Sequence, residues 1–127
     1  MSDKLDVVGI GNAMVDAIIP SNQSEIEKHE INRDSMNLID ENLKNNLHES
    51  YSIREMAGGG SLGNSMFGIT SFGGNGSFIG KIKNDEIGVY LQKDMIREGL
   101  KFPLGFTSPD ISTGCCTIFV EEDGTRT

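Results

Sequence analysis

The chain has 127 residues, of which 36% are hydrophobic and sixteen are glycine, a composition typical of a turn-rich globular domain. It carries 11 basic against 19 acidic residues, which gives a net charge of -8. This charge argues against nucleic acid or an anionic membrane as the main partner, because neither would be attracted to it. No apolar run approaches the roughly twenty residues that span a bilayer. Because the N-terminus also lacks the pattern of a signal peptide, we expect a cytoplasmic protein.

The first elements are short. Residues 5–11 ("LDVVGIG") form an apolar, β-branched run that predicts a buried strand, and residues 14–20 continue in extended conformation up to a proline. A brief helical pattern follows at 24–30, with Ser21 or Asn22 as its cap.

The next segments predict strands and helices in alternation. Residues 34–40 ("DSMNLID") predict a short strand, and their Asp40 can cap a helix in which Leu43, Leu47 and Tyr51 recur every fourth residue. The remaining elements, in chain order, are a strand at 52–58, a helix at 62–72 capped by Ser61, a strand within 73–82, a helix from Asp85 to Gly99, and a strand from 115 that enters a turn at Asp123-Gly124. This alternation predicts an α/β fold with a largely parallel sheet.

The C-terminus is unusual for a hairpin. Asp-Gly is a strong hairpin signal, yet three residues follow Gly124. We therefore expect that the returning strand is missing and that the chain is cut within a hairpin.

The cysteines and histidines do not form an obvious site. Cys115 and Cys116 are adjacent, so their side chains would point to opposite faces of a strand, which suits neither a mutual disulfide nor shared metal ligation. We expect both to pack as small apolar residues in a reducing compartment. Solvated helix positions explain His29 and His48 better than catalysis does, and we expect no metal site.

The segment "GIGNAMVD" allows more than one interpretation. Gly9 and Gly11 after a strand are compatible with a dinucleotide motif, but Met14 occupies the third glycine position and no helical periodicity follows. Alternatively, Asn12 and Asp16 follow the C-terminal end of a strand, where open α/β sheets bind ligands. An amide and a carboxylate could there hold vicinal hydroxyls. On residue types alone, a turn at Asn12 and a solvated Asp16 are slightly favoured.

The segment "GGGSLGN" places three glycines, 58–60, directly before a predicted helix. Ser61 would start this helix, whose free amides and dipole face whatever lies against the bare backbone. The segment is not a Walker A phosphate loop, because no Gly-Lys-Ser/Thr follows. Asn64 lies in the first helical turn, so its amide could point into the space that the glycines leave open. Close packing of a helix and a strand at a glycine turn explains this segment equally well.

Together, "GNAMVD" and "GGGSLGN" resemble the N-terminal half of PfkB-type, ribokinase-like carbohydrate and nucleoside kinases. Further segments agree in order. "SFIGKIKNDEIGVYLQKDMIREGL" is similar to the strand and helix that follow the family's glycine motif, and "STGCCTIFVEEDGTRT" is similar to its lid-and-sheet strand. "MNLID" favours the adenosine-kinase-like branch. The resemblance covers essentially all 127 residues.

The resemblance implies a ribokinase-like α/β fold, with residues 1–127 as the N-terminal part of a single domain. A mostly parallel sheet flanked by helices would carry the strands of a small β lid, within 14–19, 35–39 and 113–127. Lid strands in this family also allow a homodimer.

The resemblance also implies an acceptor site for a sugar or nucleoside. Asn12 and Asp16 would bind sugar hydroxyls. Asn64 would hold ribose hydroxyls. The floor of the sugar pocket would be formed by Gly59, Gly60 and Ser61.

The implied activity is transfer of the γ-phosphate of ATP to a primary hydroxyl of adenosine or a related ribosyl compound. The family's Gly-Ala-Gly-Asp stretch, which supplies the catalytic base, does not occur in this sequence. We therefore expect no catalytic residue in residues 1–127 and no complete site for ATP and Mg²⁺, and we expect this chain alone to be inactive. Two alternatives remain: a truncated, non-catalytic chain that binds a sugar or nucleoside or pairs with a partner subunit, and a nicotinamide-dependent enzyme built on Gly9 and Gly11.

Overall fold

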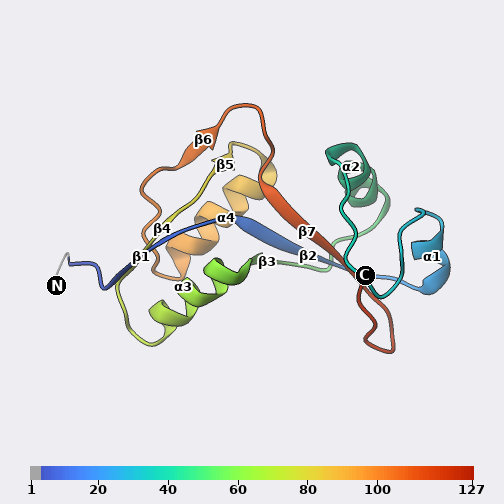
Figure 1. The fold of residues 1–127 in the computed structure, drawn as a ribbon, viewed down its shortest axis with the longest axis horizontal. Coiled ribbons are helices and arrows are strands. Elements are labelled where there is room, and N and C mark those ends of the chain that lie inside the picture. Colours follow the sequence, from blue (N-terminus) through green and yellow to red (C-terminus); the bar gives the residue numbers. More distant parts are fainter. Residues whose placement is uncertain (1–3) are drawn as a thin grey trace. The chain divides into compact units, whose positions relative to one another are not determined.

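The computed structural model describes residues 4–127 and divides the chain into two compact units. The first unit takes the residues up to Val15 together with Ala57–Cys115, and the second takes Asp16–Met56 together with Cys116–Thr127. Each unit is thus built from two separate stretches of sequence. Figure 1 follows the chain from its blue N-terminal strand to its red C-terminal hairpin.

Parallel strand pairs form the sheets of the first unit. Strand β1 (Val7–Ile10) pairs in parallel with β4 (Gly76–Ile79), with Val7 opposite Gly76. Strand β5 (Ile82–Lys83) pairs in parallel with β6 (Phe106–Ser108). These pairings, together with the helices between the strands, confirm the predicted α/β class.

Two helices pack on these strands. Helix α3 (Ser61–Ser71), green in Figure 1, contacts β1 and β4, and helix α4 (Glu86–Arg97) contacts β5. The buried apolar side chains of this unit come from both helices and from the strands, and include Met66, Phe78, Ile82, Leu91 and Met95. Their burial holds the helices against the strands, because apolar area removed from water stabilises by about 25 cal/mol per Å².

A three-stranded sheet has the order β3–β2–β7, formed by β3 (Glu55–Gly59), β2 (Met14–Pro20) and β7 (Gly114–Val120). The second unit contains part of each of these strands, together with helices α1 (Gln23–Glu27) and α2 (Glu41–Ser50). Its core combines side chains from these elements: Ile19, Ile26, Leu47 and Phe119.

Within residues 4–127, side-chain caps start three of the four helices where the sequence predicts them. Asn22 and Glu25 form a capping box on α1, Asp40 accepts the N–H of Leu43 on α2, and Asp85 accepts that of Gly88 on α4.

The predicted cap of α3 is wrong. Ser61 is the first residue of this helix, and Gly60 is the N-cap, without a side-chain hydrogen bond. The reason is the backbone turn at Gly60, whose φ of 79° and ψ of 153° are essentially restricted to glycine.

The prediction of a strand at residues 34–40 is also wrong, and with it the prediction of a lid strand at 35–39. This segment forms a turn followed by irregular backbone. The Asn37 side chain accepts the N–H of Asn32 at 2.9 Å and donates to its carbonyl at 2.9 Å. Such local side-chain bonds give the backbone an alternative to pairing in a sheet.

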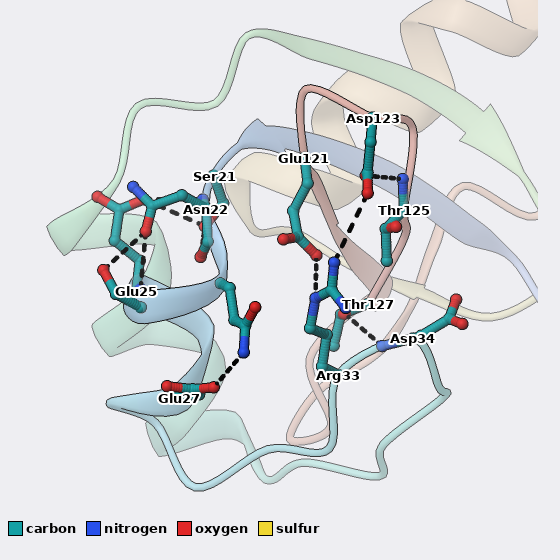
Figure 2. A network of polar contacts seen from close by, with 12 residues as sticks. Ser21, Asn22, Glu25, Glu27, Arg33, Asp34, Glu121, Asp123, Thr125 and Thr127 are labelled. Carbon is teal, nitrogen blue, oxygen red and sulfur yellow. Dashed lines mark hydrogen bonds and ion pairs between the residues drawn. The ribbon is translucent and has the colours of Figure 1, made fainter.

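The turn predicted at Asp123-Gly124 is present, and within the described residues no strand follows it. After the turn at Gly124, the N–H of Thr127 donates to the Phe119 carbonyl at 3.0 Å, and that of Phe119 donates to the Thr127 carbonyl at 2.8 Å. Residues 125–127 therefore pair with the end of β7 through an isolated bridge between Val120 and Arg126. Figure 2 shows Arg33 beside this hairpin, with its Nε 2.8 Å from Glu121 Oε2 and Nη2 3.7 Å from Asp123 Oδ2.

Among the described residues, every helix is too short or too polar to cross a bilayer.

Candidate functional site

The predicted site residues fall in both units. In the first unit, Asn12 follows β1, Gly59 ends β3, and Gly60, Ser61 and Asn64 form the start of α3. Asp16 lies on β2, in the second unit. Asn12, Ser61 and Asn64 are exposed, Asp16 is half-buried and Gly59 is buried.

Glycines allow α3 to approach the end of β1 closely. A Cβ atom on Gly11 would lie 2.7 Å from Leu62 Cδ2, and one on Gly9 would lie 2.9 Å from Met66 Sδ. The glycine pair of "GIGNAMVD" therefore accommodates α3 side chains. Strand β2 follows it instead of a helix, so the dinucleotide interpretation is wrong.

Gly60 brings the start of α3 next to the segment after β1. A Cβ atom on Gly60 would lie 3.7 Å from the Asn12 carbonyl oxygen and 3.6 Å from Met14 Cβ. The N–H of Asn64 donates to the Gly60 carbonyl at 2.9 Å, which closes the first turn of the helix. Asn12, Gly60, Ser61 and Asn64 thus gather where β1 ends and α3 begins.

The residues of this gathering offer both hydrogen-bond donors and hydrogen-bond acceptors. The first amides of a helix have no intrahelical acceptor, and they carry the positive end of the helix dipole. The amide side chains of Asn12 and Asn64 both donate and accept, as does the Ser61 hydroxyl. A compound with several hydroxyl groups would find donors and acceptors within one small region.

Asp94 is a residue of this region that the sequence analysis missed. Its carboxylate is buried on α4 and accepts the N–H of Gly58 at 3.2 Å. A signal was available, because Asp94 falls on the apolar face that Ile87, Leu91 and Met95 define.

In the second unit, Asp16 affects the neighbouring thiol of Cys116. Burial raises the pKa of Cys116, and the negative charge of Asp16 raises it further. Neither cysteine forms a disulfide. A neutral thiol fits the predicted packing role.

Both histidines differ from the prediction of solvated helix positions. His29 Nε2 lies 2.7 Å from the Tyr51 hydroxyl, and His48 Nε2 lies 2.8 Å from the Thr117 hydroxyl, both partly buried. The His29 ring thus connects the segment after α1 to the end of α2, and the His48 ring connects α2 to β7. Within residues 4–127, no group of three or more His, Cys, Asp or Glu is placed to hold a metal ion.

Comparison with models of protein families and with curated proteins found no match. Among solved structures, an adenosine kinase from Sinorhizobium meliloti is 35% identical to this chain and superposes on it with a TM-score of 0.79. The match covers 97% of this chain and 38% of the adenosine kinase. A probable sugar kinase from Rhizobium etli CFN 42 is 31% identical to this chain, with a TM-score of 0.79. The match covers 96% of this chain and 37% of the sugar kinase. The chain is PfkB-like and carries part of the ribokinase-like fold.

The same PfkB-like fold extends to more distant proteins. An adenosine kinase from Anopheles gambiae, solved with P1,P4-di(adenosine-5) tetraphosphate, has 22% identity and a TM-score of 0.77 over 94% of this chain. This PfkB-like chain spans between a third and two-fifths of the length of each of these three structures.

Proposed function

We propose that this chain is the acceptor-binding part of an ATP-dependent sugar or nucleoside kinase that works in the cytoplasm. The kinase would transfer the γ-phosphate of ATP to a primary hydroxyl of adenosine or a related ribosyl compound. The observation that carries the proposal is the gathering of Asn12, Gly60, Ser61 and Asn64 at the end of β1 and the start of α3. The similarity to an adenosine kinase at 35% identity supports the nucleoside as acceptor.

The proposed residues position the acceptor. Within the first unit, the amide groups of Asn12 and Asn64 bind ribose hydroxyls, while Gly59, Gly60 and Ser61 present backbone to the sugar. The resemblance to the kinase family assigns a sugar hydroxyl to the carboxylate of Asp16 as well. Positioning matters in this chemistry because phosphoryl transfer depends largely on orientation and charge stabilisation.

ATP and Mg²⁺ would be held by the part of the kinase fold that residues 1–127 do not span. The acidic and histidine side chains of residues 4–127 do not form a metal-binding group. We therefore assign no step through ATP or Mg²⁺ to these residues, whose role is to bind and orient the acceptor.

The first experiment measures phosphorylation of adenosine and of ribose by the complete kinase that contains residues 1–127. The unmodified kinase is compared with its Asp16→Ala variant. We expect the variant to raise KM for the acceptor at least about tenfold, since hydrogen bonds to a charged group contribute about 1.5–3 kcal/mol. Asp110→Ala is the matched control, because it removes an exposed carboxylate from a loop.

An unchanged KM in Asp16→Ala would count against the assignment of this residue. Calorimetric binding of adenosine without phosphate transfer would instead favour the non-catalytic binding chain.

A further inference from the structure

A carboxylate on the apolar face of α4 needs a physical explanation. Asp94 has 9% of its side chain exposed, and it lies between the buried Leu91 and Met95 of the same helix. Burial of a charged group is unfavourable unless hydrogen bonds and an ion pair compensate for the lost water.

The two oxygens of Asp94 have different partners. Oδ2 accepts the N–H of Gly58 at 3.2 Å, and Oδ1 forms an ion pair with Nη2 of Arg97, whose side chain is two-thirds exposed. Oδ2 thus provides the hydrogen-bond acceptor for the backbone N–H of Gly58, and Oδ1 is paired with the exposed guanidinium of Arg97.

The backbone of Gly58 is enclosed on two sides. A Cβ atom at this position would lie 2.7 Å from Phe67 Cε2 and 3.0 Å from Asp94 Oδ2. The ring of Phe67 on α3 and the carboxylate of Asp94 on α4 therefore fix the position of Gly58. Gly60, the N-cap of α3, follows two residues later.

We propose that Asp94 is a positioning residue for the acceptor site. By accepting the N–H of Gly58, it sets the position of the glycine backbone that continues into Gly59 and Gly60. This inference rests on the proposed function, in which those glycines form the floor of the sugar pocket. Asp94 itself acts through Gly58 and does not contact the acceptor.

The test compares three variants of the full chain. Asp94→Leu removes the oxygen that accepts the Gly58 N–H while filling a similar buried volume. Asp94→Asn keeps an oxygen that can accept this hydrogen bond, and Arg97→Gln removes only the ion pair. Two quantities are measured: hydrogen exchange of the Gly58 amide, and calorimetric affinity for adenosine.

We expect Asp94→Leu to speed exchange at Gly58 and to weaken adenosine binding, each at least about tenfold. Asp94→Asn and Arg97→Gln should remain within about threefold of the unmodified protein for both quantities, because the Gly58 hydrogen bond persists. A merely structural role would lower thermal stability and leave the affinity of the folded protein unchanged.

A further measurement does not depend on folding of the leucine variant. The amide proton shift of Gly58 should differ between the unmodified protein and Asp94→Asn at neutral pH, because a neutral amide oxygen then replaces the carboxylate that accepts the Gly58 N–H. A Gly58 amide shift that is identical in the two proteins would overturn the inference.

The outcomes separate the two proposals. If the unmodified protein binds adenosine and Asp94→Leu binds it equally well, the positioning role is wrong and the acceptor site stands. If the unmodified protein binds neither adenosine nor ribose, the proposed function fails, and the positioning role fails with it.

Discussion

Gly60, the N-cap of α3, and Gly68, within α3, need glycine to different degrees. Gly60 has a φ of 79°, while a Cβ atom there would meet its nearest neighbours at ordinary distances of 3.6 Å or more. Gly68 lies within α3, and a Cβ atom there would meet nothing within 4 Å. Space permits alanine at both positions, but the backbone permits it only at Gly68.

Gly60→Ala should therefore lower the free energy of unfolding by about 1–3 kcal/mol, the cost of holding a non-glycine residue in this conformation. Gly68→Ala should raise it by about 0.5–1 kcal/mol, because alanine is the better helix former. Urea denaturation of both variants measures the difference. Equal effects of the two substitutions would contradict the backbone explanation.

Cys116 provides a pH-dependent test at the residue scale. Because burial and the charge of Asp16 raise the pKa of this thiol, the folded chain holds less thiolate at a given pH than the unfolded chain does. In a Cys115→Ser background, alkylation by iodoacetamide at pH 8 should be slower for the folded protein than in urea, and Asp16→Asn should speed it modestly.

The alkylation rate of the folded protein should rise as the pH rises, because the thiolate is the reacting form. A folded protein that reacts as fast as the unfolded chain at pH 8 would show that the thiol is not perturbed.

At the scale of elements, two aspartate N-caps differ in the number of hydrogen bonds that their carboxylates accept. Asp40 on α2 accepts the N–H of Leu43. Asp85 on α4 accepts the N–H of Gly88 and, in addition, both the N–H at 2.9 Å and the hydroxyl at 2.7 Å of the buried Thr113. The second cap therefore joins a helix to a distant loop.

Asp85→Ala should lower the free energy of unfolding by about 2–4 kcal/mol, since it removes a cap and leaves the polar groups of Thr113 buried without this acceptor. Asp40→Ala should cost about 1 kcal/mol, the usual value for a cap alone. Thermal and urea denaturation of the two variants give the comparison. A cost at Asp85 no greater than that at Asp40 would show that the Thr113 contacts contribute little.

At the scale of the whole molecule, long-range pairs hold segments that the sequence separates widely. In the second unit, Arg33 pairs with Glu121, 88 residues away, and the N–H of Asp34 donates to the Thr127 hydroxyl at 2.9 Å. Glu121 has 8% of its side chain exposed, so the ion pair with Arg33 compensates for the hydration that this carboxylate loses on burial. The hydrogen bond with Glu121 also raises the pKa of Arg33.

Arg33→Gln should loosen the C-terminal hairpin, because Glu121 loses its cation while remaining buried. We expect several-fold faster hydrogen exchange at the amides of Phe119 and Thr127, which pair across the hairpin. Arg54→Gln removes the same charge from an exposed position of the same unit and should leave these amides unchanged. Protection that survives in Arg33→Gln would show that backbone pairing alone holds the hairpin.

The sequence by itself determined the features that depend on nearby residues. Asp40 and Asp85 start the helices predicted for them, because a cap acts on an amide three residues away. The apolar run at residues 5–11 contains β1, but the prediction that this strand is buried is wrong, because Val7, Val8 and Ile10 are exposed. The alternation of elements predicts the α/β class that the parallel pairs confirm.

The tertiary structure decided what depends on distant partners. The strand expected at 34–40 fails because strand formation needs a neighbouring strand, and local bonds of Asn37 compete with it. The gathering of Asn12 with Gly60 and the contact of Asp94 with Gly58 each join segments more than thirty residues apart. A sequence pattern does not encode such distances, because side-chain packing fixes them when the chain folds.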